Sequence, residues 1–122
     1  DRSLISEGCI LNAKEIVNSV IGIRSRVGEG TVIENCYVMG NDFYQNIDEM
    51  TADINNGRQL VGIGERCFLK NALIDKNCRI GNDVHISGGA HLADFSNELY
   101  AIKDGIVVVK KGVTIPDNYE IK

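Results

Sequence analysis

Aliphatic residues recur at steps of six in the centre of the chain. The recurring positions are Ile63, Leu69, Ile74, Ile80 and Ile86, with a single step of five. A helix repeats its apolar face every 3.6 residues and a strand every two, so a period of six fits neither. If each hexad forms one short strand and one corner, three hexads close a triangular turn whose aliphatic residues face its axis. The pattern, with Gly, Asn or Asp between strands, predicts an all-β fold, a single-stranded parallel β-helix of hexapeptide repeats.

The same period occurs in two further segments, over residues 5–38 and again over residues 109–121. In the first of them, Gly22 and Gly28 each follow an aliphatic residue that begins a hexad. A corner often needs a positive φ, which glycine adopts freely. We therefore expect these two glycines to be left-handed corner residues.

Two polar stretches, residues 40–62 and 87–105, lack the hexad period. They are predicted to be loops that protrude from the β-helix on one side, the first with a helical turn between Ile47 and Ile54. Loops of this length in compact domains are often functional, and open strand edges are aggregation hazards unless covered. We therefore expect both loops to lie on the side where another domain or subunit docks, with plain disorder as the alternative for the first loop. We also expect another domain or subunit to cover the first strand edge.

The chain of 122 residues is predicted to be one domain, residues 1–122, with a net charge of −4. This charge disfavours nucleic acid and anionic membranes as partners, and no apolar run reaches the roughly 20 residues of a membrane span. The first residues enter the hexad pattern without an initiator methionine. We interpret the chain as part of a longer protein.

Cysteine and histidine offer little catalytic pattern. The four cysteines lack any C-x-x-C spacing, and Cys9, Cys67 and Cys78 share one hexad position, so they are interpreted as reduced core thiols. A zinc lyase would need three histidine ligands and an acyltransferase a histidine base, whereas the chain has only His85 and His91. We expect His85 at the surface, and we expect neither a catalytic nor a metal site.

Basic side chains are the remaining candidates for chemistry. A phosphate site needs two or three cationic donors that converge, and lysines on outward corners are more often only solvated. Spacing alone does not show convergence. The candidates are Arg24, Arg26, Lys70, Lys76, Arg79, Lys103, Lys110 and Lys111.

Three segments carry a resemblance to a known family: GIRSRVGEGTVIENCYVMGNDFYQ, VGIGERCFLKNALIDKNCRIGNDVHI and GIVVVKKGVTIPDN. They closely resemble the C-terminal domain of ADP-glucose pyrophosphorylase, also called glucose-1-phosphate adenylyltransferase, especially the plant and cyanobacterial type. The resemblance implies a left-handed parallel β-helix with a regulatory and assembly role. It also implies a preceding catalytic domain that makes ADP-glucose and pyrophosphate from ATP and glucose 1-phosphate with Mg²⁺. Without that domain, this chain is expected to be inactive and to hold no cofactor.

The resemblance also implies an allosteric site for an anionic sugar phosphate. In plant and cyanobacterial members, the activator 3-phosphoglycerate and the inhibitor phosphate use lysines that match Lys76, in I-D-K-N, and Lys111. Other members respond to fructose 1,6-bisphosphate, fructose 6-phosphate or pyruvate, so the effector stays open. Further candidates that would support the site are Arg24, Lys70, Lys103 and Lys110.

Partners implied by the resemblance are the chain's own N-terminal catalytic domain and further subunits, in a homo- or hetero-tetramer of the cytoplasm or plastid. Two alternatives remain at this point. An acyltransferase built of hexapeptide repeats would use the same fold, and a purely structural oligomerisation domain would bind no phosphate.

Overall fold

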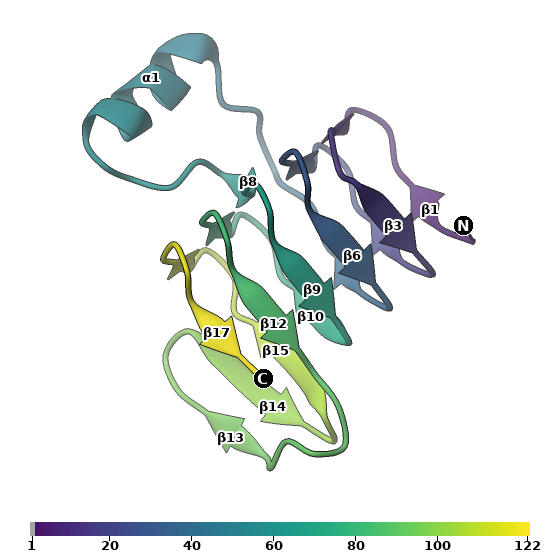
Figure 1. Cartoon of the computed structure of the whole chain (residues 1–122). Coiled ribbons are helices and arrows are strands. Elements are labelled where there is room, and N and C mark those ends of the chain that lie inside the picture. The colour runs from purple at the N-terminus through teal and green to yellow at the C-terminus, as the bar shows by residue number, and fades with distance from the viewer. Residues whose placement is uncertain (1) are drawn as a thin grey trace.

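The computed structural model describes residues 2–122 and shows a three-sided parallel β-helix (Figure 1). Each turn of the helix, here called a coil, gives one short strand to each of three sheets, and the coils are numbered 1 to 5 along the chain. Sheet A contains β1 (Leu4–Ile5), β4 (Val20–Ile21), β7 (Tyr37–Val38), β10 (Ala72–Ile74) and β15 (Ile106–Val109). Sheet B contains β2 (Ile10–Leu11), β5 (Arg26–Val27), β8 (Gly62–Ile63), β11 (Arg79–Ile80) and β16 (Thr114–Ile115). Sheet C contains β3 (Glu15–Val17), β6 (Val32–Glu34), β9 (Phe68–Lys70), β12 (His85–Ser87) and β17 (Glu120–Ile121).

The hexad aliphatics form the core, as the sequence predicts. Parallel pairing stacks Ile21, Val38, Ile74 and Val109 directly above one another on the inner side of sheet A. The side chains of the recurring central positions are at most 2% exposed; they are Ile63, Leu69, Ile74, Ile80 and Ile86. Burying such a side chain contributes about 1.5–3 kcal/mol, so the column of aliphatic residues is the main favourable term for the fold.

Corners between sheets C and A are tight turns built on asparagine. Asn18, Asn35 and Asn71 have φ values of 49°, 52° and 53°, the left-handed region that asparagine tolerates better than most residues. Their side chains form a ladder along the corner, since Asn18 donates to Asn35 and Asn35 donates to Asn71 at 3.3 Å. The step of five between Leu69 and Ile74 therefore contains a regular turn, and the same turn leads into coils 2 and 3.

The prediction that Gly22 and Gly28 are left-handed corner residues is wrong. Neither residue is among those with a positive φ, a conformation that Gly30 and Gly40 adopt instead. A Cβ on Gly22 would lie 2.3 Å from the carbonyl oxygen of Met39, and a Cβ on Gly28 would meet the backbone of the next coil at 2.6 Å. Glycine is needed at both positions because successive coils approach too closely there for a side chain.

The two polar stretches, residues 40–62 and 87–105, are here called the first and the second interruption. The first leaves the β-helix between β7 and β8 and contains the helix α1 (Ile47–Asn55), which projects from one side in Figure 1. A capping box starts α1, because Asn46 accepts from the backbone of Glu49 at 2.8 Å while the Glu49 carboxylate accepts from Asn46 N–H at 3.0 Å. The predicted helical turn is thus a helix of 9 residues. No helix within residues 2–122 is long and apolar enough to cross a membrane.

The second interruption differs from the expected protruding loop. Its strand β13 (Phe95–Ser96) pairs antiparallel with β14 (Tyr100–Lys103), and β14 pairs antiparallel with β15, so both strands extend sheet A beyond coil 5. This segment leaves from the corner between sheets C and A, whereas the first leaves between sheets A and B. The two interruptions therefore do not project from a single side. In the second, β14 covers the hydrogen-bonding edge of β15 that would otherwise be free.

Coil 1 is the exposed end of the described β-helix. Leu4 is 72% exposed, and Ile5, which faces the axis, is still 51% exposed because no coil lies beneath it. The expectation that another domain or subunit covers this edge stays a prediction.

Candidate functional site

Lys76 and Lys111 occupy the same place in neighbouring coils, at the corner between sheets A and B. The pairing of Ile74 with Val109 continues past the strands, because Gly112 N–H donates to the carbonyl oxygen of Lys76 at 2.9 Å. Neighbouring strands lie about 4.8 Å apart, so the two lysines leave the backbone about 5 Å from each other. The structure thus brings the two predicted effector lysines together, although they are far apart in sequence.

A carboxylate from the first interruption lies beside these lysines. Asp42 is 3.5 Å from Lys76 Nζ, and it accepts a hydrogen bond from the side-chain amide of Asn77 at 2.9 Å. The Asn77 side chain also accepts from Asp42 N–H at 2.9 Å, so the two residues are held reciprocally. The hydrogen bond from Asn77, and then the charges of Lys76 and Lys111, lower the pKa of Asp42. An ionised carboxylate therefore stands where the lysines would attract an anion.

Lys111 is the cation of this corner that is open to solvent. It is exposed, and no hydrogen bond or ion pair joins it to another residue within 2–122. Its neighbour Lys110 turns toward the second interruption, where it donates to Ser96 Oγ at 3.1 Å and to the carbonyl oxygen of Asn97. Lys110 thus acts as a structural tie to that segment, and Lys111 remains available to a ligand.

Arg24 lies along the same corner in coil 2, below the two lysines. Its Nε donates to the carbonyl oxygen of Asn41 at 3.0 Å, while Asn41 donates from its side chain to the carbonyl oxygen of Arg24 at 2.9 Å. Coil 2 is two coils from Lys76, a separation of about 10 Å at the usual strand spacing. The backbone of Arg24 is therefore not adjacent to that of Lys76, and its guanidinium group is tied to Asn41.

Lys70 and Lys103 belong to another part of the molecule. Lys70 closes β9 on sheet C and pairs with Glu34 at 3.4 Å, while Lys103 closes β14 and pairs with Asp94 at 3.6 Å. Both cations are partly neutralised, and sheet A separates Lys70 from the corner of Lys76. The structure does not bring these two lysines into the candidate site.

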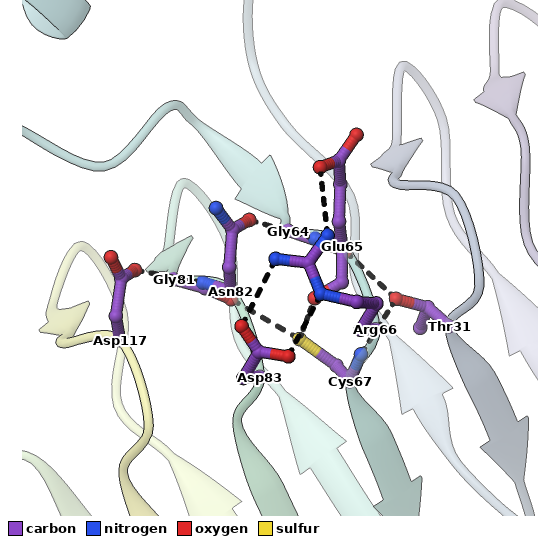
Figure 2. Close-up of polar contacts among 9 residues, drawn as sticks. All are labelled: Thr31, Gly64, Glu65, Arg66, Cys67, Gly81, Asn82, Asp83 and Asp117. Carbon is purple, nitrogen blue, oxygen red and sulfur yellow. Dashed lines mark hydrogen bonds and ion pairs between the residues drawn. The ribbon is translucent and has the colours of Figure 1, made fainter.

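The corner between sheets B and C carries a polar cluster that the sequence reading did not single out (Figure 2). Arg66 and Asp83 of neighbouring coils form a bidentate pair with distances of 2.9 and 3.0 Å. Asn82 accepts from Glu65 N–H at 2.9 Å, and Asp117 accepts from Asn82 N–H at 2.8 Å. Each contact joins one coil to the next, and those accepted by Asn82 and Asp117 also satisfy corner N–H groups, so this cluster stabilises the stack.

The cysteines are free, and three of them are buried. Burial raises the pKa of Cys36 and of Cys78 to about 11, and it raises the pKa of Cys67 as well. Cys9, in coil 1, is only partly buried. The three buried thiols are therefore protonated near neutral pH, and Cys67 and Cys78 lie in the core, as their shared hexad position indicates.

Histidine and metal chemistry are not supported by a cluster. His85 stacks on Phe68 on the outer side of sheet C, with ring centroids 5.0 Å apart. Among residues 2–122, no group of three His, Cys, Asp or Glu side chains is placed to hold a metal ion.

The outer side of sheet A carries an uncharged ladder of side chains in register, here called the sheet A ladder. These residues alternate with the buried aliphatics along each strand and pair from coil to coil. Leu4 and Tyr37 are 72% and 50% exposed, and the other members are partly exposed. The ladder contains Leu4, Val20, Tyr37, Leu73, Val108 and Ala101. Large contiguous apolar patches are typical of protein interaction sites.

Of the site, the sequence indicated the lysines but missed Asp42 and Asn77. Asn77 stands inside the quoted I-D-K-N segment, directly after Lys76, and its φ of 62° turns the chain at the corner. Asp42 lies in the first interruption, where no period places its side chain. Only the hydrogen-bonded pairing of coils 3 and 4 brings it to Lys76.

Comparison with protein families gives a match over residues 1–119 to the model described as the GLGC left-handed parallel beta-helix domain. The match covers almost the whole chain and confirms the predicted family and fold class, including the left-handed coil. It does not distinguish a plant or cyanobacterial type, which stays a prediction.

Proposed function

Because this chain belongs to the GLGC left-handed parallel β-helix domain family, we propose that it is the regulatory and assembly domain of a glucose-1-phosphate adenylyltransferase. The resemblance assigns that enzyme the formation of ADP-glucose and pyrophosphate from ATP and glucose 1-phosphate, in the cytoplasm or a plastid. The catalytic chemistry, with its Mg²⁺, would belong to a preceding domain. This chain would bind an anionic effector and join the subunits.

The observation that carries the regulatory part is the stacking of Lys76 and Lys111 on neighbouring coils. Two ammonium groups that start about 5 Å apart can both donate to one phosphate or carboxylate. The scaffold beneath them is rigid, because the lysines flank strands whose inward residues Ile74 and Val109 are 2% and 0% exposed. The backbone positions of the two lysines are thus fixed before binding, and the ordering cost that remains is that of the lysine side chains.

Asp42 gives the proposed site a built-in competitor. An arriving phosphate would meet an ionised carboxylate already paired with Lys76 at 3.5 Å. Binding would therefore displace Asp42 from Lys76 and alter the start of the first interruption, which continues into α1. Such a displacement offers a route by which the effector changes the surface presented to a catalytic domain, with coupling in the usual range of about 1–3 kcal/mol.

The assembly part is supported by the sheet A ladder. Six neighbouring strands present uncharged side chains outward, from Leu4 in coil 1 to Ala101 in β14. A surface patch depleted of charge resembles the core of a protein interface more than an ordinary sheet surface. We propose that the catalytic domain or a second subunit packs here. The same observation favours the alternative function, a purely structural oligomerisation domain that binds no effector.

Activation kinetics of the complete enzyme would separate the two functions. The activators to compare are 3-phosphoglycerate, fructose 1,6-bisphosphate, fructose 6-phosphate and pyruvate, with phosphate as inhibitor. Lys76→Ala and Lys111→Ala should each raise the activator concentration for half-maximal effect by about tenfold, the value of one charge-assisted hydrogen bond, and keep the saturated rate. Lys14→Ala removes an exposed charge in coil 1 and serves as the matched control. A fall in saturated rate at unchanged activator affinity would contradict the regulatory assignment.

A further inference from the structure

A cavity lies away from Lys76 and Lys111, between the first interruption and coils 1 and 2. Its volume is about 320 Å³, at the lower end of the usual range for small-molecule sites. Arg24 and Arg26 line one part, and Phe43, Tyr44 and Met50 line another. The cavity thus combines two cations with two aromatic rings.

Both arginines are anchored at the base of their guanidinium groups. Arg24 Nε donates to the carbonyl oxygen of Asn41 at 3.0 Å, and Arg26 Nε donates to the carbonyl oxygen of Val61 at 3.1 Å. Their terminal nitrogens make no hydrogen bond to another residue within 2–122. Both side chains are partly buried, and burial lowers the pKa of Arg26. Two oriented guanidinium groups therefore keep their outer donors free in one cavity.

The aromatic part of the cavity is also held in place. Tyr44 reaches back to coil 1, where its hydroxyl group lies over Gly8 so closely that a Cβ on Gly8 would be 2.0 Å from it. The next residue, Gln45, accepts from Val61 N–H at 2.8 Å and donates to the buried Asp53 at 2.6 Å. These contacts fix both ends of the segment, so the cavity is preformed.

Two carboxylates also line the cavity and offset part of its positive charge. Glu65 pairs with Arg66 at 3.3 Å, and its charge also acts on Arg26, where it raises the pKa against the effect of burial, whereas Glu29 is exposed to solvent. The free donors of Arg24 and Arg26 match the several oxygens of a phosphate, which guanidinium groups bind in a bidentate manner. The rings of Phe43 and Tyr44 are 45% and 52% exposed and can stack on a planar group.

We propose that this cavity is a binding site for a small organic phosphate that carries an aromatic ring. The phosphate lies against Arg24 and Arg26, and the ring lies against Phe43 and Tyr44. The site is separate from the corner of Lys76 and Lys111, which do not line this cavity. It stands whether or not that corner binds an effector.

Ligand-detected NMR titration of the complete polypeptide tests the proposal with phenyl phosphate, inorganic phosphate and phenol. Phenyl phosphate should bind more tightly than either of its parts. Arg26→Gln and Arg24→Gln should each weaken it about tenfold or more, as expected for loss of a charge-assisted contact. Phe43→Ala should weaken phenyl phosphate and leave inorganic phosphate unchanged. Lys14→Gln is the control for an equal loss of charge.

The variants also separate this site from the proposed effector corner. If Lys76→Ala and Lys111→Ala abolish phenyl phosphate binding while Arg26→Gln preserves it, the ligand occupies the corner and the cavity proposal is overturned. Affinities for phenyl phosphate in Arg26→Gln and in Phe43→Ala that both match the wild-type value, with unfolding temperatures unchanged, would also overturn the proposal. Because none of the hydrogen bonds that anchor the two arginines within residues 2–122 involves Phe43, its variant remains informative if loss of Arg24 unfolds coil 2.

Discussion

The carboxylate of Asp42 lies 3.5 Å from Lys76 Nζ, while Asn77 holds its other oxygen at 2.9 Å. Asp42 comes from the first interruption and Lys76 from the next coil, so this ion pair ties the first interruption to the stack of coils. The pair occupies the cation to which the proposed effector would bind. Effector and carboxylate are therefore expected to compete.

Asp42→Asn should increase the affinity for an anionic effector. The amide keeps hydrogen-bonding capacity toward Asn77 but removes the negative charge, and an exposed pair of this kind accounts for about a two- to fivefold change in affinity. Calorimetric titration of the variant and of wild type with 3-phosphoglycerate or phosphate measures the effect. Asp94→Asn, which removes a similar exposed partner from Lys103, is the matched control. Weaker binding in Asp42→Asn would mean that Asp42 helps to hold the ligand.

Asp53 is expected to make the docking of α1 depend on pH. Hydrogen bonds from Gln45 and then Arg79 lower the pKa of Asp53, whose ordinary value is about 3.9. Since the docked carboxylate has the lower pKa, its contribution is complete above about pH 4 and is lost as the pH falls through the lowered value. Hydrogen exchange of residues 45–61 should therefore accelerate, beyond the intrinsic pH effect, below about pH 4.

Asp53→Ala provides the test of this linkage. The variant should show rapid exchange over residues 45–61 at neutral pH, since Arg79 and Gln45 lose their shared acceptor. The stack of coils should stay protected. Exchange in the variant that matches wild type at pH 7 would show that other contacts dock the segment.

Close packing of the coils predicts a large effect at Gly64. A Cβ there would lie 2.4 Å from the carbonyl oxygen of Gly81, so Gly64→Ala should lower the free energy of unfolding by about 1–3 kcal/mol or more. Gly57→Ala is the control, because nothing lies within 4 Å of its Cβ and only its φ of 71° opposes the change. Denaturant unfolding of both variants measures the difference. A smaller loss for Gly64→Ala than for Gly57→Ala would contradict the packing argument.

The sheet A ladder predicts a surface whose alteration affects assembly more than folding. Leu73→Lys places a charge at the middle of the ladder, where the paired neighbours are Tyr37 and Val108. It should reduce the molar mass of the assembled protein in light scattering, or loosen the catalytic domain, and keep the unfolding temperature within a few degrees. Val32→Lys, on the outer side of sheet C next to Glu15, is the control. If the molar mass of the assembled Leu73→Lys protein matched that of wild type, the sheet A ladder would not be part of the interface.

The sequence predicted the coil because its period follows directly from the geometry of the inward positions. Ile80 and Ile86 lie where the hexads place them, and the same arithmetic held for Ile115 and Ile121. Residues without a period were less predictable. The segment of β13 and β14 lacks the hexad period and was therefore expected to be a loop. Its pairing with β15 depends on contacts between segments that the sequence of a short strand does not indicate.

The candidate site was predictable in part, for a related reason. Lys76 and Lys111 were available from the family resemblance, but their adjacency results from the register of β10 on β15. Lys70 is six residues before Lys76, and yet sheet A lies between them, so spacing along the chain was a poor guide to convergence. Asp42 required the placement of the first interruption, which no local pattern determines.

Calorimetric titration of the complete enzyme with 3-phosphoglycerate, fructose 1,6-bisphosphate and phosphate tests the central claim most directly. Wild type should bind at least one of these anions, and Lys76→Ala or Lys111→Ala should weaken that binding about tenfold or more, while Lys14→Ala leaves it unchanged. Parallel titration of residues 1–122 alone would show whether the stacked lysines suffice or whether the catalytic domain completes the site. Binding that is equally strong in wild type, Lys76→Ala and Lys111→Ala would contradict the regulatory role proposed for this corner.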